Sequence, residues 1–275
     1  MQITKANREL QEFDEHKLRR SLKKASIPVD LHDQILEKLQ PTLYEGIPTS
    51  HIYDTVDIIV SSLFPAGRCT YNLKQAIMKL GPSGFPFERY VAELLSRQGW
   101  QVEVGKMMRG RCVSHEVDVV AKQEDCVRVI ECKYKSNSGD RPDVKVPLYI
   151  QSRFLDIAAG ELSSVSQEKI ERWVITNTRF SSDARSYGEC VGLRMVDWQS
   201  PSGESLREMI EKVSLHPITS LTVLTEQHIA TLLERGVVFA MDLAHRPELL
   251  EGLSFSAAQE KMLANELDQL SKCSI

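Results

Sequence analysis

The stretch Ser114–Lys135, SHEVDVVAKQEDCVRVIECKYK, contains two runs of apolar, mostly β-branched residues. These runs, Val117–Ala121 and Val127–Ile130, are separated by a polar segment. Two such runs joined by a short polar turn are typical of a β-hairpin. The sequence therefore predicts a hairpin at the centre of the chain.

Acidic and basic residues lie at one end of this predicted hairpin. Asp118 lies near the start of the first strand, and Glu131-Cys132-Lys133 closes the second. Because side chains alternate along a strand, Glu131 and Lys133 share one face while Cys132 points to the other. Two carboxylates and an ammonium at one end of a hairpin favour a divalent-metal site.

The same residues suit phosphodiester hydrolysis. That reaction needs a metal ion to activate water and to offset charge on the phosphate, and hard cations such as Mg²⁺ or Mn²⁺ take oxygen ligands. We expect Asp118, Glu131 and the backbone carbonyl of Cys132 to bind the metal, with Glu88 reaching the site from a helix. Lys133 would orient the attacking water or stabilise the developing charge.

Composition limits the class of protein. The chain has 275 residues, 42% of them hydrophobic and 26% charged, with a net charge of −4. DNA binding would therefore need a local basic patch. No apolar run approaches the roughly 18 residues of a membrane span, and the N-terminus lacks the apolar core of a signal peptide. The six cysteines show no metal-ligand spacing, so we expect reduced thiols and a cytoplasmic protein.

The central segment, 84–200, follows the predicted linker Gly81-Pro82-Ser83-Gly84. Strand patterns alternate with helix patterns along it, which favours a mixed α/β sheet flanked by helices. The expected helices are 85–98, 148–159 and 181–190, and the expected strands beside the hairpin are 100–104, 173–177 and 193–197.

The two flanking segments are mainly helical. Residues 1–80 predict a short strand at Ile3–Lys5, a helix N-capped by Asp14, and helices over 29–39, 52–63 and 70–80. Residues 216–275 predict a helix opened by Thr225 and closed by Gly236, followed by short helices ending near Leu270. This last segment resembles helix–hairpin–helix modules, which bind the DNA backbone; a helical dimerisation or capping module fits equally well.

The central segment resembles the PD-(D/E)xK nuclease superfamily, and specifically the Mrr-like type IV restriction endonucleases. Asp118 stands for the Asp of the motif and Glu131-Cys132-Lys133 for its (D/E)xK, while Phe85–Leu95 and Thr176–Ala184 match flanking family segments. The resemblance implies a Mg²⁺-dependent DNA endonuclease with Gln151 assisting the site. Ser114–Val117 replaces the glycines that usually precede the Asp and is closer to Holliday-junction-resolvase-like members, so the DNA substrate stays open.

Residues 1–80 resemble an ATP-cone, the nucleotide-sensing module of ribonucleotide reductases. The resemblance rests on EFDEHKLRRSL, on IPTSHIYDTV and on YNLKQA. It implies that Lys5 and Lys17 contact the phosphates of ATP or dATP and that Thr49 lies nearby. The family usually has Lys-Arg-Asp-Gly after the first strand, whereas this chain has Lys5-Ala6-Asn7-Arg8, without the glycine turn.

The combined prediction is a homo-oligomeric, metal-dependent DNA endonuclease of restriction or repair type whose N-terminal domain senses ATP or a deoxynucleotide. The alternative is a non-catalytic, nucleotide-sensing regulator that binds DNA, with a salt-bridged cluster in place of a working site. Several residues also have ordinary explanations. Glu88, Lys5 and Lys17 can be solvated side chains, and Lys106, Arg109 and Arg111 form a basic loop that either contacts phosphate or is simply solvated.

Overall fold

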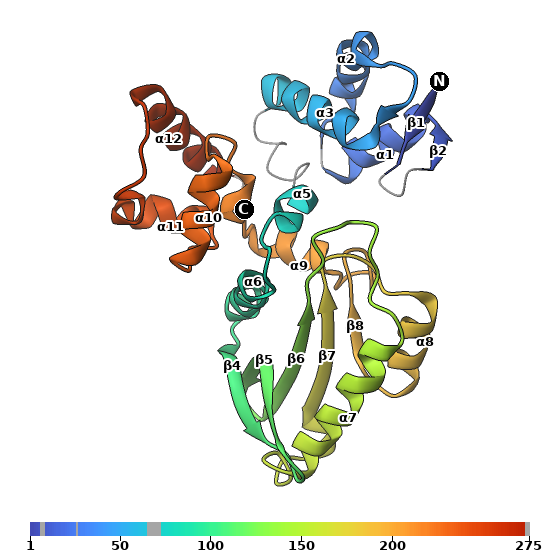
Figure 1. Ribbon diagram of the computed structural model, residues 1–275, viewed down its shortest axis with the longest axis vertical. Helices are drawn as coiled ribbons and strands as arrows, with labels where there is room; N and C mark the ends of the chain where they lie inside the picture. Colours follow the sequence, from blue (N-terminus) through green and yellow to red (C-terminus); the bar gives the residue numbers. More distant parts are fainter. Residues whose placement is uncertain (6–8, 26, 65–72, 273–275) are drawn as a thin grey trace.

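The structure is a computed structural model that describes residues 1–275 except 6–8, 26, 65–72 and 273–275. Three groups of elements follow one another along the chain (Figure 1). A small N-terminal domain precedes a five-stranded sheet with helices, and a cluster of helices follows near the C-terminus. Residues Ala6-Asn7-Arg8, where the ATP-cone family has its glycine turn, and Thr70, the expected start of a helix, lie outside the described residues.

The N-terminal domain combines three helices with a small sheet. The helices are α1 (Glu15–Lys24), α2 (Val29–Leu39) and α3 (Thr49–Leu63), and a 3₁₀ turn, η1 (Gln40–Thr42), follows α2. The strands β1 (Gln2–Thr4), β2 (Leu10–Glu12) and β3 (Ile47–Pro48) are ordered β2-β1-β3. Asp14 caps α1 as predicted, because its carboxylate accepts the His16 amide at 2.9 Å. The expected mainly helical domain is confirmed, with two more strands than the sequence indicated.

The central sheet has the order β4-β5-β6-β7-β8. Its strands are β4 (Gln101–Arg109), β5 (Ser114–Gln123), β6 (Cys126–Lys133), β7 (Ile170–Thr176) and β8 (Arg194–Val196). The β4, β5 and β6 strands pair antiparallel, whereas β6, β7 and β8 run parallel. The predicted hairpin and the mixed α/β sheet are therefore confirmed.

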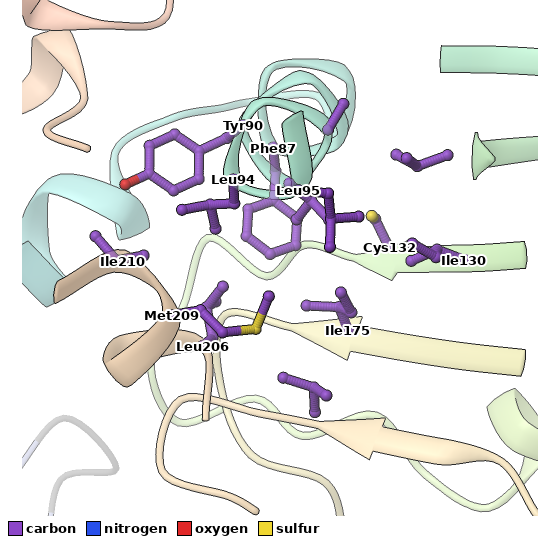
Figure 2. Packing of buried hydrophobic residues seen from close by; sticks show 14 of the residues in the cluster. Phe87, Tyr90, Leu94, Leu95, Ile130, Cys132, Ile175, Leu206, Met209 and Ile210 are labelled. Carbon is purple, nitrogen blue, oxygen red and sulfur yellow. The ribbon is translucent and has the colours of Figure 1, made fainter. Parts of the chain in front are cut away.

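Helices cover both faces of this sheet. One core cluster joins α6 (Phe85–Ser96) and α9 (Leu206–Val213) to the face that carries Cys132. The other cluster joins α7 (Lys145–Ala159) and α8 (Ser182–Cys190) to the opposite face. In Figure 2, Phe87 and Leu95 of α6 pack over Cys132, with Met209 of α9 close by. Burial of each such side chain contributes about 1.5–3 kcal/mol to folding, so these two layers fix the sheet.

The helix α5 (Leu73–Met78) packs into the central core although it precedes the predicted linker at residues 81–84. The Tyr134 hydroxyl, next to Lys133, donates to the Met78 carbonyl at 2.6 Å and accepts the Gly81 amide at 3.0 Å. An added Cβ on Gly81 would lie 2.5 Å from the Tyr134 ring, so glycine is needed for this close approach. The end of α5 is thus attached directly to the strand that carries Glu131 and Lys133.

The C-terminal helices share one apolar core. They are α10 (Glu226–Glu234), α11 (Ala240–His245) and α12 (Ala257–Lys272). The 3₁₀ turn η3 (Ile218–Ser220) precedes α10, and η4 (Pro247–Leu250) lies between α11 and α12. Thr225 caps α10 by accepting the His228 amide at 3.2 Å, and Gly236 adopts φ 76° after the helix, as expected. The expectation of only short helices was wrong, because α12 is a 16-residue helix. Its Leu263, Leu267 and Leu270 cover the core of the module.

Within the described residues, no helix combines the length and the apolar character that crossing a membrane requires.

Candidate active site

The site begins where β5 and β6 separate. Their backbone pairing ends at Val119–Ile130, one residue before Asp118. Beyond that point the Cys132 amide donates to Oδ2 of Asp118 at 2.7 Å. The carboxylate therefore occupies the position at which the backbone of β5 would otherwise accept from β6, and it lies at the fork between the two strands.

Glu131 lies at the same fork and is almost completely buried, with 3% of its surface exposed. Lys133 Nζ contacts its Oε1 at 2.5 Å, and Arg153 Nη1 contacts its Oε2 at 2.8 Å. A buried carboxylate is stable only when it is paired in this way. The predicted alternation is confirmed, because Cys132 packs into the opposite core.

Glu88 approaches the fork from the first turn of α6. Partial burial, together with the nearby charges of Asp118 and Glu131, raises its pKa to about 7. Burial and the charge of Glu131 likewise raise the pKa of Asp118 to about 6. Among the described residues, Lys133 and Arg153 pair with Glu131 and not with Glu88 or Asp118, so a further cation would stabilise the ionised forms of these two acids.

The donor set fits a hard divalent cation. Mg²⁺ is commonly bound by one or two carboxylates together with waters and substrate phosphates, rather than by a complete protein cage. Within the described part of the chain, no set of three or more His, Cys, Asp or Glu side chains forms such a cage. Asp118 and Glu88 supply carboxylate oxygens, while both oxygens of Glu131 are engaged by Lys133 and Arg153.

Arg153 is the site residue that sequence reasoning missed. It lies on α7, and besides Glu131 it donates to the Glu116 carbonyl and stacks near the Tyr149 ring, 5.4 Å from the ring centroid. The helix carries no motif signal at this position. Its periodicity places Ile150, Phe154 and Ile157 on the buried face, and only the packing of α7 across the sheet brings Arg153 to Glu131.

Gln151 lies elsewhere on α7. Its side chain accepts from Arg172 at 3.2 Å and approaches the Val191 carbonyl at 3.5 Å. These partners belong to the seam between α7, β7 and the end of α8. Its role as a helper of the catalytic carboxylates stays a prediction.

His115 and the loop before the hairpin are held by α7. The His115 ring lies 2.8 Å from Asp156, whose carboxylate also accepts the Cys112 and Val113 amides at 2.8 and 3.2 Å. The His115 hydrogen bond in particular holds the pKa of Asp156 far below its usual range. These contacts give His115 a positioning role at the start of β5. The expectation of a basic loop was wrong for Lys106 and Arg109, because both belong to β4, and Lys106 pairs with Glu103 of the same strand at 2.6 Å.

The residues expected to bind a nucleotide meet in one cavity of the N-terminal domain. Lys5, Lys17 and Thr49 all line a cavity of about 200 Å³ between β1, α1 and the start of α3. Thr49 is the first residue of α3, so the free amides of that helix end lie nearby. The folding of the chain thus brings together three residues that are far apart in sequence.

The raised pKa values predict how stability depends on pH in the absence of divalent cations. The folded-state pKa of Glu88, about 7, lies above its ordinary 4.5, so the folded state binds its proton more tightly. The stabilisation of the folded state by protonated Glu88 is fully present below about pH 4.5 and is lost as the pH rises through about 7. Glu88→Gln should therefore be more stable than the wild type near pH 8, by about 1 kcal/mol because the group is only half-buried, and lose this advantage near pH 4.

Urea unfolding in EDTA at both pH values measures the difference. Glu234→Gln, an exposed residue at the end of α10, is the control and should show no pH-dependent gain. A Glu88→Gln variant less stable than the wild type near pH 8 without metal would contradict the described electrostatics.

Comparison with known families defines the class of the central domain. Residues 81–200 match the family model described as restriction endonuclease, and they contain the whole five-stranded sheet and the fork. The central domain is therefore of the restriction endonuclease class, which implies a nuclease acting on DNA.

The remaining matches define the family of the whole chain. Residues 216–271 match a model described as AF1548-like, C-terminal. A protein of Archaeoglobus fulgidus, described as uncharacterized, is 34% identical over 173 residues, which are 62% of this chain and 94% of the relative. The chain belongs to the AF1548-like family.

A solved structure agrees with this assignment. The crystal structure of AF1548, a protein of unknown function, superposes with a TM-score of 0.56 at 28% identity and covers 69% of this chain and all of the other. The two family models leave residues 1–80 unmatched, so the resemblance of that segment to an ATP-cone stays a prediction.

Proposed function

We propose that the protein is a divalent-metal-dependent DNA endonuclease whose active site is the fork between β5 and β6. The observation that carries this proposal is the cluster of Glu88, Asp118 and Glu131, in which burial and mutual repulsion raise two of the three carboxyl pKa values. A folded protein tolerates such a cluster when a cation or a reacting group uses it.

The residues divide the chemical work between them. Asp118, Glu88 and the Cys132 carbonyl would hold the metal, which, when bound, supplies charge for the scissile phosphate and makes water more acidic. Lys133, whose side chain is one-third exposed, would hold the attacking water. Glu131 would fix the Lys133 ammonium in place, and Arg153 would fix Glu131.

The burial of Cys132 argues against thiol chemistry. Burial raises the pKa of its thiol well above the ordinary value, so the thiolate is suppressed. Its side chain also packs into the apolar core beside Phe87 and Leu95 of α6 (Figure 2). Cys132 contributes to the site through its backbone. Its amide donates a hydrogen bond to Asp118, and its carbonyl would bind the metal.

A substrate panel tests the proposal. Supercoiled, methylated, branched and single-stranded DNAs would be incubated with the protein in Mg²⁺ or Mn²⁺, with EDTA as the matched control. We expect cleavage of at least one DNA form, abolished by EDTA. Cleavage that continues unchanged in EDTA would contradict the metal-dependent mechanism.

A non-catalytic regulator is the second candidate, and one observation favours it. Lys133 and Arg153 occupy both oxygens of Glu131, as in a purely structural ion-pair cluster. Under this candidate the central domain binds DNA without cutting it. DNA binding without cleavage of any form in either metal would select this function.

We further propose that ATP or dATP binds the N-terminal cavity and regulates the nuclease. Lys5 and Lys17 would contact the phosphates, and Thr49 would lie beside them at the start of α3. Ammonium groups and free helix amides are a suitable environment for a triphosphate.

Lys17→Gln should weaken ATP binding about tenfold, because one charge-assisted contact to phosphate is lost. Titration calorimetry with ATP measures the change. Lys23→Gln is the matched control, since Lys23 is an exposed lysine of the same helix and does not line the cavity. Equal ATP affinities for Lys17→Gln and the wild type would contradict the nucleotide assignment.

A further inference from the structure

A second and larger cavity lies between the N-terminal domain and the central domain. Its volume is about 380 Å³, within the range of small-molecule sites, which is about 300–1,000 Å³. One wall comes from α1 and α3, including Ser50 and Tyr53, and another from α5, including Lys74. Arg179 and Trp198, which follow β7 and β8, close the other side.

These walls meet at the edge that carries the active site. The strands β6, β7 and β8 are parallel, so the segments after them lie at the same end of the sheet. Glu131 and Lys133 end β6 at that edge, which is where ligands bind in open parallel sheets. Figure 1 places α5 between the N-terminal domain and the helices α6 and α9.

The charge of this interdomain cavity is positive. Lys74, Arg179 and Arg207 all line it. Arg207 pairs with Glu211 at 2.6 Å, but among the described residues no carboxylate lies within ion-pairing distance of Lys74 or Arg179. Arg179 bonds to the neutral Gln199, and Lys74 faces the Trp198 ring at 6.0 Å.

Lys74 and Arg179 line the same cavity, and their like charges repel each other. Burial lowers the pKa of Lys74, and the charge of Arg179 lowers it further. Asp197 acts in the opposite direction, but Arg185 already pairs with its carboxylate. A bound polyanion would relieve this repulsion.

We propose that the interdomain cavity is a binding site for a small polyphosphate ligand. It adjoins the cavity of Lys5 and Lys17, because Thr49 and Tyr53 line both. Lys74 and Arg179 would contact neighbouring phosphates, because a flexible ammonium and a planar guanidinium are the usual phosphate partners. Ser50 offers a further hydroxyl, and Tyr53 and Trp198 supply the apolar surface that an attached base or ribose would cover.

The site is connected directly to the catalytic strand. Lys74 and Met78 belong to α5, and the Met78 carbonyl accepts the Tyr134 hydroxyl beside Lys133. Asn177 also approaches the Met78 sulfur at 3.2 Å. A ligand that fixes Lys74 would thus fix the helix that holds the residue next to Lys133. Only this last consequence rests on the proposed nuclease function.

Binding of inorganic tripolyphosphate to the full chain tests the site without reference to nuclease activity. The measurement uses titration calorimetry in a Lys17→Gln background, which weakens the N-terminal cavity. Lys74→Gln and Arg179→Gln should each weaken the remaining binding about tenfold. Lys79→Gln, an exposed lysine just after α5, should leave it unchanged.

Two outcomes would overturn the proposal. One is unchanged tripolyphosphate affinity in both Lys74→Gln and Arg179→Gln. The other outcome concerns a short DNA duplex, titrated in place of tripolyphosphate. If Lys74→Gln weakens binding of the duplex but not of tripolyphosphate, the cavity is part of a DNA-binding surface. If Lys74→Gln fails to fold, Lys74→Arg, which keeps the charge, should retain binding while Arg179→Gln loses it.

Discussion

Lys133→Ala should reduce Mg²⁺-dependent DNA cleavage by a factor of about 10³ or more, comparable to the loss of one preorganised group that stabilises the transition state. The Lys133 ammonium is held at 2.5 Å from Glu131 and is the cation at the fork that remains partly exposed to substrate. Its removal eliminates both the group that orients water and a positive charge near the phosphate.

Lys135→Ala is the matched control for this experiment. Lys135 lies two residues further along the same segment, and it is the backbone of Lys135 that bonds to Asn177, at 2.8 Å. The Ala variant keeps those bonds, so its cleavage rate should match the wild type. Equal DNA cleavage rates for Lys133→Ala and Lys135→Ala would show that Lys133 is not a catalytic residue.

Arg153→Met should destabilise the fold by about 3 kcal/mol, because it leaves the buried Glu131 with only one of its two cations. The same substitution should also reduce cleavage, since Glu131 then no longer holds Lys133 in a fixed position. Urea unfolding in EDTA measures the loss of stability, and the cleavage assay in Mg²⁺ measures the second effect.

Two further variants separate the buried ion pair from side-chain packing. Arg97→Met breaks the exposed pair between Arg97 and Glu93 and should cost less than about 1 kcal/mol. Adding Glu131→Gln to Arg153→Met should recover part of the stability, because the uncompensated charge is removed. If Arg153→Met costs no more than Arg97→Met, the buried pair does not hold the site together.

Much of the local structure could be predicted from the sequence because it depends on short-range rules. The alternation of Glu131, Cys132 and Lys133 follows from the two-residue period of a strand. The cap of α1 by Asp14 follows from the chemistry of helix ends. The hairpin itself follows from its two β-branched runs.

The remaining features depend on how distant elements pack. Arg153 reaches Glu131 only because α7 packs on the face of the sheet formed with β5 and β7, and a helical period of 3.6 residues does not predict which strands lie beneath a helix. The same limit applies to Gln151, whose side chain turns toward Arg172. The bond from the Cys132 amide to Asp118 also needs the strands to separate at one particular residue.

The arrangement of the domains was likewise beyond the sequence. The apolar residues of α5 fit a helix at the end of the N-terminal segment, yet Leu73 and Ile77 pack with the central core. The interdomain cavity is therefore lined by residues that range from Ser21 to Arg207 in the sequence, and no local sequence pattern connects them. The prediction of a domain border at 81–84 stays a prediction.

The most direct measurement of the central claim compares the wild type with Asp118→Asn in cleavage of the best substrate of the DNA panel in Mg²⁺. Asparagine keeps the size of the side chain and an oxygen that can accept the Cys132 amide, but it removes the charge that would hold the metal. We expect the variant to fold, to bind DNA and to lose cleavage by a factor of about 10³ or more. Cleavage by Asp118→Asn at the wild-type rate would contradict a metal-dependent site at the fork of β5 and β6.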